Sequence, residues 1–420
     1  MLDTVQLNFL NLLRQFIQPH TGEHFLETDA EGWEKLFYLA VQQKAVPMIY
    51  DSAGRLSAFL RCPQELRNEW KWKSLAGIAQ QAMRTDAFLE LYRSMEERGI
   101  SALVIKGLIC RRMFAKPDLR ISSDEDILIQ PQNQEKCWEF LREQGFQCWD
   151  GEPDGYESAW LNQENQLYLE VHTSLMPADA KPFCLLNDEF TQVFENKKAV
   201  DVDGKMVWTL DDTSHFFYLL CHAYKHFVNS GVGVRQLCDI LMMAEQCGPS
   251  IDWEYVIGCT KRFHMYVFWM NLFDIGEEYL GFRWEKSGCP RPENVKPDSE
   301  ALLLDMLDGG IYGKSSVGRL HSANITMSAV KDEKGAAGEI SLKSSLFPPK
   351  SYMEKQYPYV KENGLLLPAA WMQRGFRYWK KIQRLKKEGQ DSLDSIAVGK
   401  QRVALLKQYG ILADDQNGEK

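Results

Sequence analysis

The most informative segment of the sequence is Asp124-Glu-Asp-Ile-Leu-Ile129, which is followed directly by Gln130-Pro131. An apolar run that a proline closes predicts a short buried strand. Side chains two positions apart project from the same face of a strand, so Asp124 and Asp126 should point the same way. Two such carboxylates can share a divalent cation, because hard cations such as Mg²⁺ prefer oxygen ligands.

Further strands are predicted on both sides of this stretch. They are Ser101-Ala-Leu-Val-Ile105, Gln166-Leu-Tyr-Leu-Glu-Val-His172 and Lys205-Met-Val-Trp-Thr-Leu210. Residues 135–144 have helical periodicity and end at Gly145, a residue suited to a helix C-terminus. The middle strand carries Glu170, which predicts a third carboxylate beside the aspartate pair.

Helical periodicity dominates the chain outside these strands, including residues 211–227 and 234–245. We therefore predict an α+β fold with a small mixed sheet, flanked by N-terminal and C-terminal helical regions. Four parts are expected: a helical region at 1–95, the core at 96–215, a substrate- or nucleotide-binding helical region at 216–285, and a C-terminal extension at 286–420.

Composition narrows the class of protein. The 420 residues carry a net charge of −9, which disfavours a surface built to hold long nucleic acid. The ten cysteines form no C-x-x-C pair, as expected of core thiols in a reducing compartment. We find neither a targeting segment nor an apolar run long enough to cross a bilayer. A cytoplasmic protein is expected, or one that sits on a membrane surface.

Groups suited to phosphate lie next to the predicted carboxylates. Lys106-Gly107 follows the first strand, where backbone N–H groups and an ammonium could meet phosphate oxygens. Arg120 and the hydroxyls of Ser122 and Ser123 come just before the aspartate pair and suit a triphosphate.

Together these runs resemble a family of uncharacterised nucleotidyltransferases within the DNA-polymerase-beta-like superfamily. The main runs are Leu103-Val-Ile-Lys-Gly107, Leu119-Arg-Ile-Ser-Ser-Asp-Glu-Asp-Ile-Leu-Ile129 and Leu169-Glu-Val-His172. Shorter similarities are Trp33-Glu-Lys-Leu-Phe-Tyr-Leu-Ala40, His222-Ala-Tyr-Lys-His226, Gly233-Val-Arg-Gln-Leu-Cys-Asp239, Tyr357-Pro-Tyr-Val360, Leu367-Pro368 and Arg374.

The resemblance implies a polymerase-beta-like core that moves a nucleotidyl group, AMP from ATP, to a hydroxyl of a small molecule or protein. Asp124 and Asp126 would hold two Mg²⁺ ions, and Glu170 would bind the catalytic ion and help to activate the acceptor. This sequence departs from the pattern twice. Glu125 replaces an apolar residue and could add charge to the site or face solvent, and Lys106-Gly107 replaces the superfamily's Gly-Ser pair.

The resemblance also implies a set of nucleotide-binding residues. They are Lys106, Gly107, Arg120, Ser122, Ser123, His172, His222, Lys225, His226 and Arg235. His215, His222 and His226 share one helical face, but the glutamate of a zinc-hydrolase motif is missing, so they line the nucleotide cleft or serve the structure. Arg235 with Asp239 could equally be helix support, and His172 could simply cap its strand.

Residues 374–387 contain seven basic and no acidic side chains, interleaved with aromatic ones. A basic amphipathic helix there could contact a membrane surface or RNA, or form a solvated helix face. A second hypothesis for the whole chain is a non-catalytic nucleotide-binding or scaffold protein of a membrane-associated glycan pathway. The three intact carboxylates favour the enzyme.

Overall fold

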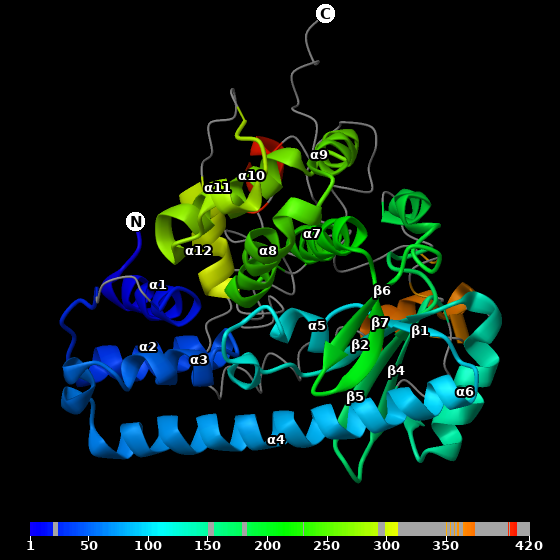
Figure 1. Cartoon of the computed structure of the whole chain (residues 1–420), viewed down its shortest axis with the longest axis horizontal. Coiled ribbons are helices and arrows are strands. Elements are labelled where there is room, and N and C mark those ends of the chain that lie inside the picture. Colours follow the sequence, from blue (N-terminus) through cyan, green and yellow to red (C-terminus); the bar gives the residue numbers. More distant parts are fainter. Residues whose placement is uncertain are drawn as a thin grey trace, which may run out of the picture. The chain divides into compact units, whose positions relative to one another are not determined.

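The computed structural model describes residues 1–19, 24–149, 155–178, 183–229, 231–292 and 299–309, together with 350, 353, 357, 359–360, 364–373, 402 and 404–409. The chain divides into two compact units. One comprises Met1–Lys225 with Gly233–Leu307, and the other comprises His226–Val232 with Asp308–Lys420. The first unit contains the sheets and the long helices around them (Figure 1).

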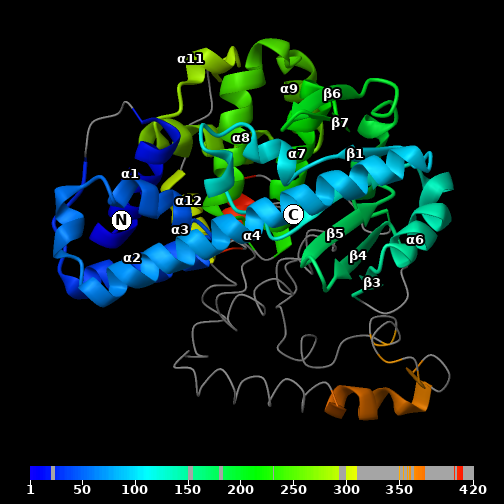
Figure 2. The ribbon, with the colours of Figure 1, turned by 60° about the horizontal axis from the view of Figure 1, so that its bottom comes forward.

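The N-terminal helices begin at acidic caps and bury one apolar face. α1 (Thr4–Ile17) starts after Asp3, whose carboxylate accepts the Gln6 N–H at 2.8 Å, and α2 (Ala30–Gln42) starts after Asp29 in the same way. α3 (Val46–Ala53) packs on α1, and α4 (Gln64–Glu97) is one long helix that crosses the sheet (Figure 2). The predicted helical region before residue 95 is confirmed.

The main sheet has the strand order β1-β2-β5-β4-β3. The strands are β1 (Ala102–Val104), β2 (Glu125–Ile129), β3 (Gln147–Cys148), β4 (Glu157–Asn162) and β5 (Leu167–His172). β2 and β5 are parallel, whereas the other neighbours are antiparallel. The strands predicted for β1, β2 and β5 and the mixed character of the sheet are confirmed. β3 and β4 were not predicted.

The two faces of this sheet carry different side chains. Ile127, Leu169 and Trp160 point into a core that they share with Phe88 of α4 and Leu141 of α6 (Gln134–Glu143). Because side chains alternate along a strand, Asp126 and Glu170 point to the opposite face. The apolar face packs against the core, and the opposite face carries the polar side chains Asp126 and Glu170.

Further elements follow the sheet in sequence. β6 (Lys198–Val202) and β7 (Lys205–Thr209) form a hairpin, of which only β7 was predicted. The helices are α5 (Leu108–Arg111), α7 (Asp212–Asn229), α8 (Val234–Cys247), α9 (Trp253–Arg262), α10 (Tyr266–Ile275), α11 (Trp284–Ser287) and α12 (Ser299–Gly309). The Asp211 carboxylate caps α7 by accepting the N–H of Ser214 at 3.0 Å.

In the second unit, Met353, Tyr357, Val360 and Ala370 form a small apolar cluster. The basic stretch at 374–387 lies outside the described residues.

No helix in the described part of the chain is long and apolar enough to cross a bilayer. The ten cysteines are free thiols, most of them buried. The four-part division of the chain stays a prediction.

Candidate active site

The sheet brings two of the three predicted carboxylates together. Asp126 on β2 and Glu170 on β5 are direct partners in the parallel register, so their side chains lie next to each other. Asp126 is fully buried, whereas the Glu170 side chain is 22% exposed. Asp124 lies one residue before β2 and two before Asp126, at the entrance to the strand.

Lys106 supplies the positive charge at this pair. Its Nζ lies 2.6 Å from Asp126 Oδ1. Burial by itself would raise the pKa of Asp126, but the Lys106 ammonium and His172 outweigh it and hold that pKa well below its ordinary value. Asp126 is therefore a carboxylate throughout the neutral range.

Glu170 behaves in the opposite way. Burial and the negative charge of Asp126 raise the pKa of Glu170 to about 9. Glu170 therefore keeps its proton at neutral pH unless a further positive charge joins the site.

His172 stands between acidic groups. Its Nε2 lies 3.4 Å from Asp126 Oδ1 and 3.9 Å from Glu170 Oε2, and its Nδ1 lies 3.6 Å from Glu157 Oε2. Glu157 is the residue of β4 that pairs with His172 in the antiparallel register. The sequence prediction missed Glu157 because it missed β4. Burial alternates along residues 157–162 in the structure, but their sequence, ESAWLN, does not alternate between apolar and polar residues, so no sequence signal marked β4.

The donor set fits a divalent cation. Asp126, Glu170 and His172 each offer an atom, and these atoms all lie within 4.8 Å of one another. Asp126 Oδ2 is buried and has no hydrogen-bond partner among the described residues. A buried oxygen without a partner is costly, and a cation would satisfy it.

Helix α7 contributes polar groups on the same side of the sheet as these carboxylates. The Nε2 atom of His222 lies 3.1 Å from Lys106 Nζ. Burial lowers the pKa of Lys225, against the attraction of Glu157 and other acidic groups. His226 follows Lys225 on α7 and belongs to the second unit, so its predicted role stays a prediction. His215 is buried, with Nε2 2.8 Å from the Ile105 carbonyl oxygen, and serves the structure.

Gly107 and Glu125 fasten the loop that carries Lys106. Gly107 has φ +40°, and a Cβ there would lie 2.2 Å from Glu125 Oε2. Glu125 accepts the Leu108 N–H at 2.8 Å and pairs with the buried Arg111 at 2.6 Å. Glu125 therefore neither adds charge to the site nor faces solvent, and both of these expectations were wrong. Strand alternation turns its side chain toward the core face, where Arg111 neutralises it. Glu125 positions the loop.

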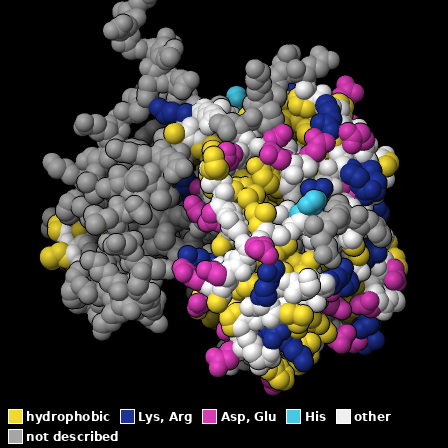
Figure 3. Space-filling model, turned by 90° about the vertical axis from the view of Figure 1, so that its left-hand side faces the viewer, with side chains coloured by type: hydrophobic (Ala, Val, Ile, Leu, Met, Phe, Trp, Pro, Cys, Tyr) yellow, Lys and Arg dark blue, Asp and Glu magenta, His cyan; other side chains and the backbone are white. Residues whose placement is uncertain are grey.

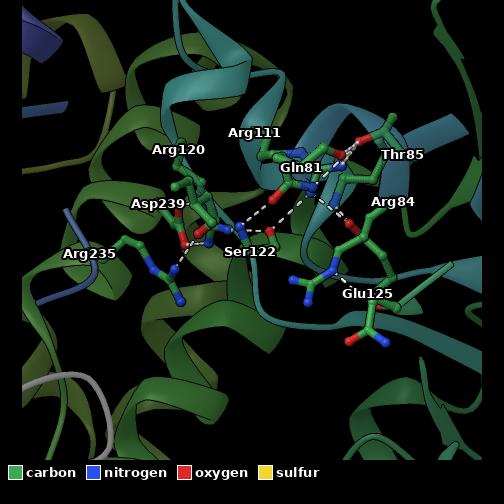
Figure 4. A network of polar contacts seen from close by, with 12 residues as sticks. Gln81, Arg84, Thr85, Arg111, Arg120, Ser122, Glu125, Arg235 and Asp239 are labelled. Atoms are coloured by element: carbon green, nitrogen blue, oxygen red, sulfur yellow. Dashed lines mark hydrogen bonds and ion pairs between the residues drawn. The ribbon is translucent and has the colours of Figure 1, made fainter. Parts of the chain in front are cut away.

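The residues just before β2 form a buried polar network, shown in Figure 4. Arg120 forms a two-pronged ion pair with Asp239 of α8, in which Nε lies 3.0 Å from Oδ1, and Nη1 donates to Ser122 Oγ at 2.7 Å. Any contact of Arg120 with a triphosphate would have to compete with this pair. Arg235 donates to the Ile121 carbonyl, and Lys44 to Ser123 Oγ. The network holds residues 120–123 in place immediately before Asp124.

A mixed sheet whose parallel strands carry neighbouring carboxylates, with a lysine-glycine turn beside them, agrees with the predicted nucleotidyltransferase core. The chain belongs to the family of uncharacterised nucleotidyltransferases, whose family model matches residues 29–280. The protein is therefore a transferase that binds a nucleotide and an acceptor. The similarities at 357–374 lie beyond that match.

No curated protein matches this sequence. One matching solved structure is that of the antibiotic-resistance factor ANT(2'')-Ia, which is 9% identical. The alignment covers 50% of this chain and 100% of that one, with a TM-score of 0.30.

Proposed function

We propose that this chain transfers a nucleotidyl group, AMP from ATP, to a hydroxyl of a small molecule or a protein, with Mg²⁺ at Asp124, Asp126 and Glu170. The observation that supports this most strongly is the register of β2 and β5, which sets Asp126 beside Glu170. The Lys106 ammonium and the unpartnered Asp126 Oδ2 add to it.

The chemistry follows from these groups. The acceptor oxygen forms a bond to the α-phosphorus, the bond from that phosphorus to the pyrophosphate oxygen breaks, and the acceptor loses its proton. The partly exposed Glu170 is the group placed to take that proton. Lys106 offers its charge to phosphate oxygens. Two bound Mg²⁺ ions would supply positive charge that offsets the triphosphate and lowers the pKa of Glu170.

The proposal extends to partners and location. The chain acts in the cytoplasm and does not hold long nucleic acid. The net charge of −9 argues against binding of long nucleic acid. The mixture of acidic and basic side chains over the described part of the face in Figure 3 argues the same way. The proposed nucleotide contacts are Lys106, Gly107, Ser122, Ser123, His172, His222, Lys225, His226 and Arg235. Arg120 joins them only if its ion pair with Asp239 breaks.

The test uses ATP, GTP, CTP and UTP labelled at either the α- or the γ-phosphorus, with Mg²⁺ and a cell extract as the source of acceptor. We expect α-label on an acceptor and γ-label in pyrophosphate. Asp124→Asn/Asp126→Asn should abolish the transfer, whereas Glu143→Gln, in an exposed ion pair with Arg98, should keep it. Incorporation of γ-label, or transfer by the double variant, would refute the proposal.

A further inference from the structure

We infer that His172 is a nitrogen ligand of the metal ion at this site and that Glu157 orients its imidazole, so that the site prefers Mn²⁺ to Mg²⁺. The inference rests on the proposed function, since it concerns the ion bound by the same carboxylates. It adds a ligand, a positioning residue and a metal preference that three carboxylates would not give.

The separations of the donor atoms fit one ion. Divalent ions of this size bind nitrogen and oxygen at roughly 2.1 Å, so two donors of one ion lie at most about 4.2 Å apart. His172 Nε2 is 3.4 Å from Asp126 Oδ1 and 3.9 Å from Glu170 Oε2. Both separations are inside that limit, and the donor atoms of all three side chains lie within 4.8 Å of one another, so small side-chain movements would bring them onto the same ion.

Glu157 faces the other ring nitrogen of His172. Its Oε2 lies 3.6 Å from Nδ1, a position fixed by the pairing of β4 with β5 (Figure 1). A neutral imidazole carries its proton on one nitrogen only. With an ion bound, a proton on Nδ1, facing the Glu157 carboxylate, would leave the Nε2 lone pair directed at that ion. Carboxylates that fix the ring of a metal-binding histidine in this way commonly strengthen metal binding.

Burial gives independent support. His172 is 3% exposed, and its Nδ1 has no hydrogen-bond partner among the described residues. Asp126 Oδ2 also has no hydrogen-bond partner among the described residues, since Lys106 contacts Oδ1 of that carboxylate. The buried Asp126 thus keeps an oxygen that a bound ion would satisfy, and the Nδ1 atom of the buried His172 faces Glu157 rather than that ion.

The donor set decides the preference among metals. Carboxylates suit Mg²⁺ and Mn²⁺ alike, whereas imidazole suits transition metals. Mg²⁺ also gives up its water reluctantly and binds to proteins through few direct ligands. One imidazole and two carboxylates in a buried site therefore favour Mn²⁺.

The test is pulsed electron paramagnetic resonance of Mn²⁺ bound to the full-length protein. Inorganic triphosphate replaces ATP, because adenine would contribute nitrogen of its own. We expect modulation from a directly bound ¹⁴N in the wild type. His172→Gln should lose that modulation and bind Mn²⁺ at least 10-fold more weakly, with a smaller change for Mg²⁺. Glu157→Gln should keep the nitrogen but weaken Mn²⁺ binding about 10- to 100-fold.

His24→Gln, which changes an exposed histidine, is the matched control and should match the wild type. Mn²⁺ bound without nitrogen modulation would overturn this inference and leave the proposed nucleotidyl transfer standing. A wild-type protein that binds no Mn²⁺, with or without triphosphate, would overturn both.

Discussion

Asp126 and Glu170 are neighbours across two strands, yet they hold their protons very differently. Lys106 and His172 keep Asp126 ionised, whereas burial and Asp126 itself raise the pKa of Glu170 to about 9. Two carboxylates whose pKa values are pushed apart commonly have different tasks in catalysis. Asp126 is suited to remain ionised and bind a cation. Glu170 is suited to accept a proton once a cation has bound at the site.

Glu170→Gln should therefore affect the rate more than the affinity. The change keeps the size of the side chain but removes the group that takes the proton. We expect turnover to fall roughly 10²-fold or more, the scale typical of a positioned acid–base group, with Mg·ATP affinity within a few-fold of the wild type. Initial rates and isothermal titration measure the two quantities. Wild-type turnover in this variant would show that Glu170 is not catalytic.

At the scale of elements, the buried Arg111–Glu125 pair joins α5 to β2 and so holds the turn that carries Lys106. Arg111→Met alone would leave Glu125 charged and unpaired in the core, which should cost about 3–5 kcal/mol of unfolding free energy. Arg111→Met/Glu125→Leu should recover most of that loss, because the family's apolar residue returns. Urea unfolding measures both variants.

The exposed Arg98–Glu143 pair provides the control for this experiment. Arg98→Met should change the unfolding free energy by no more than about 1 kcal/mol, because a surface pair is screened by solvent. Equal losses in Arg111→Met and Arg111→Met/Glu125→Leu would mean that the ion pair is not what fastens α5.

His215 ties α7 to the end of β1, and its protonation should control stability in acid. Burial lowers the pKa of His215 to about 4, from 6.5 in an unfolded chain. As pH falls from about 6.5 to about 4, the unfolded chain binds a proton that the folded protein excludes. The wild type should therefore lose up to about 3 kcal/mol over this range relative to His215→Gln.

Urea unfolding at several pH values compares the two proteins, and only the difference between their curves reports on His215. His24→Gln should keep the wild-type dependence, because His24 is exposed. Parallel curves for the wild type and His215→Gln would show that this histidine does not titrate differently on folding.

For the whole molecule, charge is distributed unevenly along the sequence. The chain is acidic, with a net charge of −9, yet residues 374–387 carry only basic charges. That segment lies outside the family match and outside the described residues, whereas the proposed active site lies within 29–280. Catalysis and surface association should therefore be separable.

Changing Arg377, Lys380, Lys381 and Arg384 to Gln should leave nucleotide turnover unchanged. It should weaken sedimentation with vesicles containing phosphatidylserine, because each basic residue near an anionic surface contributes about 1 kcal/mol. If the variant binds vesicles as well as the wild type does, the segment is not a membrane contact. If the variant instead loses binding to RNA, the segment is an RNA contact. Loss of turnover in the folded variant would place the segment in the active site.

Local sequence patterns were sufficient to predict several of the strands and helices. Short apolar runs marked β1 and β2, and alternating apolar residues marked β5. The shared face of Asp124 and Asp126 stays a prediction, because Asp124 lies just before β2. The helices at 135–144, 211–227 and 234–245 followed from their periodicity and caps, because these properties belong to short segments.

Contacts between distant residues depend on how the elements pack. The pairing of β4 with β5 placed Glu157 against His172, and the packing of α8 brought Asp239 to Arg120, which is 119 positions away. Alternation made the burial of Glu125 predictable, but its partner Arg111 came from another element. Strand register and helix packing are set by the core as a whole, so no local pattern contains them.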